Sequence, residues 1–227
     1  CARSWKGSRG RSMCHKQLPA GYVLHETIDL QKNKRQFWSV NLLSIVLAVL
    51  LAGAGILIAP FSGFSAQLSD EGYLLVQVLP ACITALLGAA VYLIAHELTH
   101  GMFLYAFTRV KPKFGFVGWA AYCGNGAYCD KPRYAVVALS PLVIWGVIFG
   151  VLNVFFHEGI WFWAIWLLQI VNIAGASGDL FVFFKLLRYP QNILVGDTGL
   201  KMCVYVPATT EDATKAADNM SEKGDNV

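Results

Sequence analysis

Four long apolar segments, separated by short polar connections, occupy most of the chain. The expected membrane-spanning helices cover about residues 37–60, 73–107, 134–156 and 160–187. Each is long enough to cross ~30 Å of hydrocarbon as a helix. Polar residues dominate 1–18 and 208–227, which we interpret as disordered tails, the first of them basic. The pattern therefore predicts an all-α membrane protein with one domain of four transmembrane helices over residues 19–207.

Two segments outside these spans have a different pattern. Between spans two and three, bulky residues alternate from Phe114 to Asp130 and are interrupted by Asn125-Gly126, which is typical of a β-hairpin. We expect a small hairpin-like cytoplasmic insertion there. Its edge could pair with an extended substrate, or the segment could plug a site, and the sequence favours neither. Residues 22–30 fit either an extended strand or a surface segment.

Composition and charge agree with a membrane location. Hydrophobic residues make up 56% of the chain and charged residues 14%, with a mean hydropathy of +0.50, whereas soluble domains carry about 25% charged residues. All 18 Lys and Arg lie in residues 3–35, in 109–133, or from 185 onward, and none lies in 61–72 or 157–159. This alternation predicts a multi-pass protein with both termini in the cytoplasm. Nucleic acid is not an expected partner, because no basic patch with interleaved aromatic residues is present.

The six cysteines do not suggest a disulfide framework. Five of them fall in the expected cytoplasmic zones, where thiols stay reduced, namely Cys1, Cys14, Cys123, Cys129 and Cys203. Cys123 and Cys129 are separated by five residues, whereas zinc-binding pairs usually have two to four, and no second pair follows. We therefore expect reduced structural thiols.

The second expected span contains a His-Glu-x-x-His motif, His96 to His100. On a helix the two histidines are one turn apart and share a face. Two imidazoles at this spacing can hold one Zn²⁺, and Glu97 can then act as base on the metal-bound water. Ionisable groups at membrane depth cost ~2.5–3.5 kcal/mol each and usually mark function. The alternative is a chance match, with both histidines bonded to neighbouring helices.

A third candidate ligand lies in the fourth span. Asp179 is the only acidic residue there, and Asn172, seven residues earlier, shares its helix face. Measured from the cytoplasmic helix ends, Asp179 and His96 lie at depths that agree to within about a turn. We expect Asp179 to bind zinc, with pairing to Lys185 or to a helix terminus as the alternative. Asn172 fits either substrate binding and oxyanion stabilisation or a structural interhelix hydrogen bond.

With these residues the chain resembles site-2-protease-like intramembrane zinc metalloproteases, since the His96–His100 motif precedes a Pro-containing span and a later Asn-to-Asp motif. It resembles more closely a bacterial family of uncharacterised zinc-peptidase-like membrane proteins. That resemblance covers about residues 18–205 and includes Leu18 to Tyr22, Ile28 to Lys34, and Asn172 to Asp179. It implies a bacterial cell (inner) membrane and one Zn²⁺ per chain, held by His96, His100 and Asp179, with Glu97 catalytic.

Together these features predict an intramembrane zinc metalloprotease that cuts membrane-anchored proteins near the cytoplasmic face. A zinc-activated water would attack, and Glu97 would be the general base. The expected partners are a membrane-anchored protein substrate and the lipid bilayer. Two alternatives stay open. One is a zinc-dependent membrane hydrolase of a non-peptide substrate, and the other is a non-catalytic scaffold with structural zinc. An intact Glu97 argues against the scaffold, because a structural site needs no base.

Overall fold

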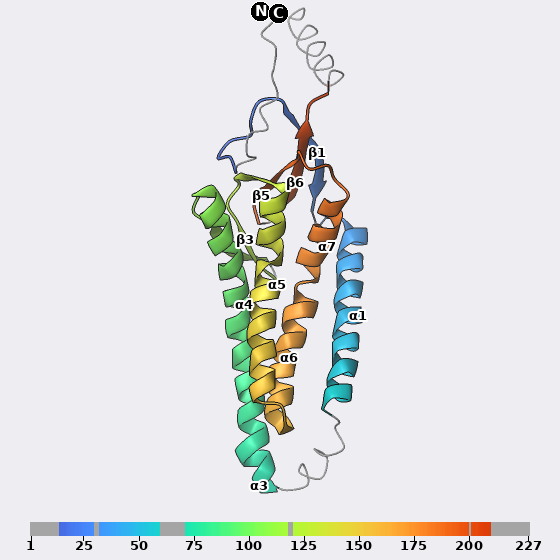
Figure 1. The fold of residues 1–227 in the computed structure, drawn as a ribbon, viewed down its shortest axis with the longest axis vertical. Helices are drawn as coiled ribbons and strands as arrows, with labels where there is room; N and C mark the ends of the chain where they lie inside the picture. Colours follow the sequence, from blue (N-terminus) through green and yellow to red (C-terminus); the bar gives the residue numbers. More distant parts are fainter. Residues whose placement is uncertain (1–13, 30–31, 60–70, 118–119, 200, 210–227) are drawn as a thin grey trace, which may run out of the picture.

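Four long helical segments lie side by side and form the body of the molecule (Figure 1). The computed structural model describes residues 14–29, 32–59, 71–117, 120–199 and 201–209. The expected tails up to residue 13 and from residue 210, and most of the expected outer loop, lie outside these ranges. Within them, four segments are long and apolar enough to cross a membrane. They are α1 (Lys34–Ile58), the run from α3 to α4 (Glu71–Thr108), α5 (Lys131–Phe155) and the α6–α7 pair (Gly159–Leu187).

Large apolar side chains cover the outer faces of these helices. Exposed fractions reach 84% at Leu57 on α1, 71% at Leu86 on α4 and 74% at Phe155 on α5. Soluble proteins rarely expose contiguous apolar surface on this scale. Helices also satisfy their own backbone hydrogen bonds, as hydrocarbon requires. The chain therefore has the build of a multi-pass membrane protein.

The second and fourth spans are not single regular helices. The second begins with α3 (Glu71–Tyr73) and a π-helical turn, η2 (Leu74–Val78), and continues as α4 (Leu79–Thr108). Pro80 follows the π-helical turn directly, so the helix is irregular at the point where the proline has no N–H to donate. The fourth span divides into α6 (Gly159–Gly175) and α7 (Ser177–Leu187), with Ala176 outside helical geometry. Asn172 and Asp179 therefore do not lie on one continuous helix, contrary to expectation.

A four-stranded antiparallel sheet caps one end of the bundle, which corrects the all-α prediction. Its order is β1 (Tyr22–Ile28), β6 (Met202–Pro207), β5 (Leu194–Asp197) and β4 (Tyr128–Asp130). The sheet lies where α1 and α5 begin and α7 ends (Figure 1). Its buried core consists of Ile28, Cys129, Tyr134, Leu186, Ile193, Val195, Met202 and Val204. These strands are short, and β6 and β5 pair with β1 and β4 across long sequence separations, so the local pattern did not reveal β5 and β6.

The expected hairpin between the second and third spans is confirmed, but its turn lies elsewhere. β2 (Lys113–Val117) pairs antiparallel with β3 (Ala120–Gly124). The connection falls at residues 118–119, outside the described residues, and Asn125-Gly126 follows β3 instead. The Asn125 and Gly126 N–H groups both donate to the Asp197 carbonyl. The Asn-Gly step thus joins the hairpin to the end of β5, and the chain then enters the larger sheet as β4.

Candidate metal centre

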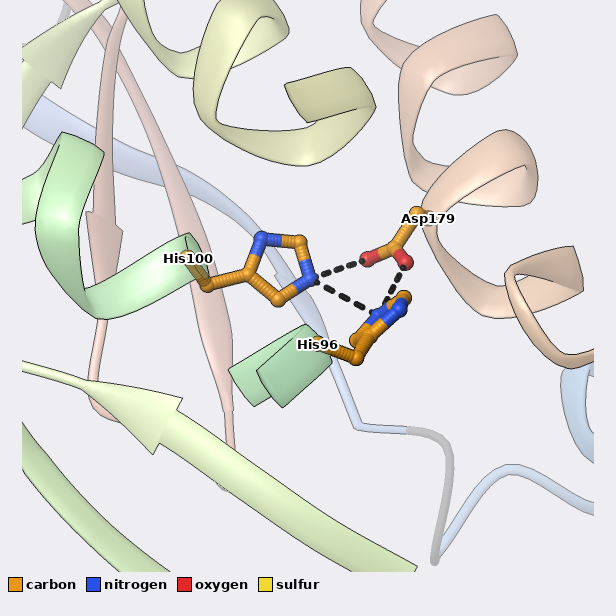
Figure 2. A group of neighbouring side chains, drawn as sticks. All are labelled: His96, His100 and Asp179. Atoms are coloured by element: carbon orange, nitrogen blue, oxygen red, sulfur yellow. Dashed lines mark hydrogen bonds and ion pairs between the residues drawn. The ribbon is translucent and has the colours of Figure 1, made fainter. Parts of the chain in front are cut away.

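His96, His100 and Asp179 come together where α4 meets the first turn of α7 (Figure 2). The two histidine Nε2 atoms are 3.2 Å apart. His96 Nε2 lies 3.2 Å from Asp179 Oδ2, and His100 Nε2 lies 3.3 Å from Asp179 Oδ1. The structure thus brings together the three residues that the sequence predicted as ligands, and they form a group that could hold a metal ion.

A proline on α5 provides the partner that orients His100. His100 Nδ1 lies 2.9 Å from the Val137 carbonyl oxygen, which can only accept, so Nδ1 carries the hydrogen. That carbonyl would normally bond the N–H four residues later, but residue 141 is Pro and has none. Ser140 Oγ donates to the same oxygen at 2.9 Å. Because Nδ1 is protonated, the neutral ring presents a lone pair at Nε2 toward Asp179.

A relay of three residues orients His96. The Asn172 Nδ2 donates to the Leu142 carbonyl at 3.2 Å, which leaves Oδ1 to accept from the Tyr92 hydroxyl at 2.9 Å. The tyrosine hydrogen is then committed, so the tyrosine oxygen accepts from His96 Nδ1, 2.9 Å away. His96 therefore has the same tautomer as His100, with its Nε2 lone pair directed at the cluster. The sequence analysis did not single out Tyr92, although it lies one turn before His96.

The resulting geometry suits a cation. The Nε2 atoms of His96 and His100 and the carboxylate oxygens of Asp179 lie 3.2–3.3 Å apart. With both rings in these neutral tautomers, each Nε2 presents a lone pair and no hydrogen lies between the three groups. A tetrahedral zinc ion with bonds of ~2.0–2.1 Å separates its ligand atoms by ~3.3 Å, which matches this spacing. Two imidazoles and one carboxylate are also a usual ligand set for catalytic zinc, with one position left open. The residues present therefore fit zinc.

A cavity of about 720 Å³ opens beside this cluster. Its walls come from five helices, the hairpin and the four-stranded sheet. Glu97 lines the cavity together with the three candidate ligands. The α1 wall includes Lys34, Phe37, Val40, Asn41 and Ser44, and the hairpin wall is residues 121–123. The expected base is therefore in the same cavity as the expected metal group, at a volume typical of small-ligand sites.

Asp197, at the end of β5, is a cavity residue that the sequence analysis missed. Its Oδ1 accepts from the Gly199 N–H at 2.6 Å, and its Oδ2 accepts from the Tyr134 hydroxyl. Burial raises the pKa of Asp197 despite these two hydrogen bonds. The turn it holds packs on β3 so closely that a Cβ on Gly124 would lie 2.1 Å from the Gly199 nitrogen. An Asp-x-Gly turn was visible in the sequence, but nothing local placed it at the cavity.

Two further residues have contacts that bear on the sequence analysis. Asn172 is fully buried, and its amide bonds to Tyr92 and Leu142 as described above. These contacts are interhelical, and a role toward substrate stays a prediction. Lys185, considered as a partner for Asp179, instead forms an ion pair with Glu26 at 2.5 Å.

Residues 89–194 match the DUF3267 family, described as "Putative zincin peptidase". The matched segment contains the His-Glu-x-x-His motif and Asp179, so all three candidate ligands and Glu97 lie within it. A zincin family implies zinc, in agreement with the geometry of the cluster. No curated protein and no solved structure matches the chain.

Proposed function

We propose that this protein is an intramembrane zinc metalloprotease of the His-Glu-x-x-His type, resembling site-2 proteases. The observation that carries the proposal is the arrangement of His96, His100 and Asp179. Their ligand atoms are 3.2–3.3 Å apart, with neighbours that leave every inward-facing atom an acceptor. The match to a zincin peptidase family over residues 89–194 supports the same chemistry.

Each residue then has a defined task. His96, His100 and Asp179 would hold the ion. A zinc ion bound there lowers the pKa of water and polarises a carbonyl oxygen. Glu97 takes the proton of the attacking water and delivers it to the leaving amine, a general acid–base role worth ~10²–10⁴-fold in rate. The Tyr92–Asn172 pair and the Val137 carbonyl keep both rings in the required tautomer.

The shape of the site supports an extended segment of a membrane-anchored protein as substrate. The cavity is bounded by the span α1 on one side and the hairpin on another, so it is adjacent to both bilayer and polar surface. Asn41 and Ser44 place polar groups on the α1 wall within an otherwise apolar span, where such groups usually serve function. We propose that a substrate backbone bonds there or to the hairpin edge.

The charge pattern supports the orientation. The sheet and the hairpin lie at the bundle end that carries the Lys- and Arg-rich connections (Figure 1), and residues of both line the cavity. By the positive-inside rule this end is cytoplasmic, and we propose a bacterial cell membrane as the location. Cleavage would then occur near the cytoplasmic face.

Replacing Glu97 by Gln tests the proposal. The Glu97→Gln protein should keep wild-type zinc, measured by elemental analysis of the purified protein, but lose cleavage by ~10²–10⁴-fold. Proteomics of membrane fractions should then show uncleaved proteins accumulating relative to wild type. Glu158→Gln is the matched control, because its side chain is 85% exposed and lies in the turn between α5 and α6, outside the cavity lining. Identical cleavage products in Glu97→Gln and wild-type cells would contradict the proposal and favour a scaffold with structural zinc.

A further inference from the structure

The segment before β1 attaches to the free edge of β4. The His15 N–H donates to the Tyr128 carbonyl at 2.7 Å, and the Tyr128 N–H donates back to the His15 carbonyl at 2.8 Å. Such an exchange defines a hydrogen-bonded pair of an antiparallel ladder. The adjacent pair is then non-hydrogen-bonded, with Cα atoms ~4.5 Å apart. Those adjacent residues are Cys14 and Cys129.

The two thiols face each other. Cys14 packs against the buried cluster that contains Cys129, and the two sulfurs are close enough for each thiol to affect the pKa of the other. Disulfides span Cα separations of ~4.4–6.8 Å, so a cross-strand pair at a non-hydrogen-bonded position can close with little backbone movement. Both cysteines are free thiols in this structure. The register and the thiol contact therefore agree on one pair of sulfurs.

The surroundings of the pair differ in a way that suits stepwise oxidation. Cys14 is partly exposed, whereas Cys129 is 1% exposed. A dissolved oxidant therefore reaches the Cys14 sulfur more readily than the Cys129 sulfur. The thiolate is the nucleophile in cysteine oxidation. Cys14 is therefore the sulfur that reacts first, and Cys129 is positioned to attack it afterwards.

We propose that Cys14 and Cys129 form a reversible redox site whose oxidant is a peroxide. The Cys14 thiolate attacks one peroxide oxygen, the O–O bond breaks, and the second oxygen leaves as water after taking up a proton. Cys14 is then a sulfenic acid. The Cys129 sulfur attacks the Cys14 sulfur, the S–O bond breaks, and a second water leaves. Two thiols and one hydrogen peroxide thus give one disulfide and two waters, and a dithiol reductant reverses the change.

The disulfide would fasten the chain around the sheet. β1 already occupies the edge next to β6, and the bridge would fix the segment at residue 14 to the opposite edge, at β4. β4 pairs with β5, whose last residue Asp197 lines the cavity. The covalent link would therefore attach the segment from Cys14 to β1 at both edges of the four-stranded sheet, which forms one wall of the cavity. In a reducing cytoplasm the thiols stay free until an oxidant appears.

Peroxide treatment of the purified full-length protein tests this site without reference to peptidase activity. After hydrogen peroxide, free thiols are alkylated and peptides are mapped by mass spectrometry without reduction. A Cys14–Cys129 linked peptide should appear, disappear with dithiothreitol, and accompany an upward shift of the thermal unfolding midpoint. Cys14→Ser should abolish both the linked peptide and the shift.

Cys203→Ser is the matched control, since Cys203 lies in the same sheet and its sulfur contacts the Thr27 hydroxyl. It should leave the linked peptide and the shift unchanged. Cys123 is an internal reference for a thiol that should not react with peroxide, because burial raises its pKa to about 12. The proposal is overturned if Cys14 stays fully alkylatable after peroxide, or if it is found joined to another cysteine or to a second chain. An equal thermal shift in Cys14→Ser would overturn it as well.

Discussion

Two polar clusters on α7 differ in how their groups are satisfied. Lys185 donates to Glu26 at 2.5 Å, and the Tyr189 hydroxyl donates to the other oxygen of the same carboxylate. Donors and acceptors are matched there, and the cluster ties the end of α7 to β1. Six residues earlier, Asp179 faces two imidazole lone pairs, so three acceptors meet without a donor. The matched cluster holds elements of the fold together, whereas the unmatched one is built for a cation.

The largest expected effect comes from removing a ligand at the unmatched cluster. Asp179→Ala should reduce bound zinc from about one ion per chain to near zero, because two imidazoles alone make an incomplete site. Lys185→Met, on the same helix, should keep its zinc. Elemental analysis of both purified proteins provides the measurement. Wild-type zinc in Asp179→Ala would remove that residue from the site.

A smaller effect is expected from the residues that orient the ligands. Tyr92→Phe removes the oxygen that accepts from His96 Nδ1, and losing such a partner typically costs ~10–100-fold in metal affinity. Chelator competition on the purified protein measures the affinity. Tyr105→Phe serves as the control, since Tyr105 is 44% exposed on the same helix. Equal affinities for the two variants would argue against the Tyr92–Asn172 relay.

Pro141 provides a finer test of the same idea. Pro141→Ala restores an N–H that competes with His100 for the Val137 carbonyl, so zinc affinity should fall by up to ~10-fold, the lower end of the range for such partners. Pro132→Ala is the matched control, because that proline lies in the first turn of α5, where no carbonyl is freed. A loss of affinity in both variants would indicate a general effect on α5.

The smallest expected effect is on the stability of the fold and comes from the cluster of Glu26, Lys185 and Tyr189. Burial acts to raise the pKa of Glu26, but the hydrogen bonds from Lys185 and Tyr189 outweigh it and hold that pKa below its ordinary value of 4.5. The unfolded chain therefore takes up the proton first as the pH falls. Glu26 should stabilise the fold fully above about pH 4.5, and this contribution should be lost as the pH falls through the lower folded-state value.

Glu26→Gln should cost about 1 kcal/mol at neutral pH, since the carboxylate is 34% exposed and solvent screens the pair. The difference from wild type should shrink on acidification below about pH 4.5. Thermal unfolding of both proteins across the acidic range measures it. Zinc content should be unchanged. A difference that grows toward low pH would contradict the assignment of Glu26 as a carboxylate stabilised by its partners.

Much of the bundle and the centre of the site could be predicted from local pattern. Span positions follow from runs of apolar residues, because hydrocarbon thickness sets a minimum helix length. The spacing of His96 and His100 follows from helix geometry, and the match to a zincin family agrees with it. The hairpin was also predicted, although its turn was assigned to the Asn-Gly step rather than to residues 118–119.

Other features depended on contacts between residues far apart in sequence. The pairing of β1 with β6 joins opposite ends of the chain, and the pairing of β4 with β5 joins its middle to its C-terminal part. Short strands also carry little periodicity of their own. Asp197 reaches the cavity only through that sheet. Because the helix breaks at Ala176, Asn172 contacts Tyr92 and Asp179 contacts the histidines. The seven-residue spacing therefore did not place Asn172 and Asp179 on one face of a continuous helix.

By itself, the amino-acid sequence determined which groups are present and how neighbouring residues in one helix face, because the helical repeat is a local property. The tertiary structure alone decided which partner each group meets. It assigned Lys185 to Glu26 and the Val137 carbonyl to His100, and it placed Cys14 opposite Cys129. These pairings depend on packing between elements that the local pattern does not encode.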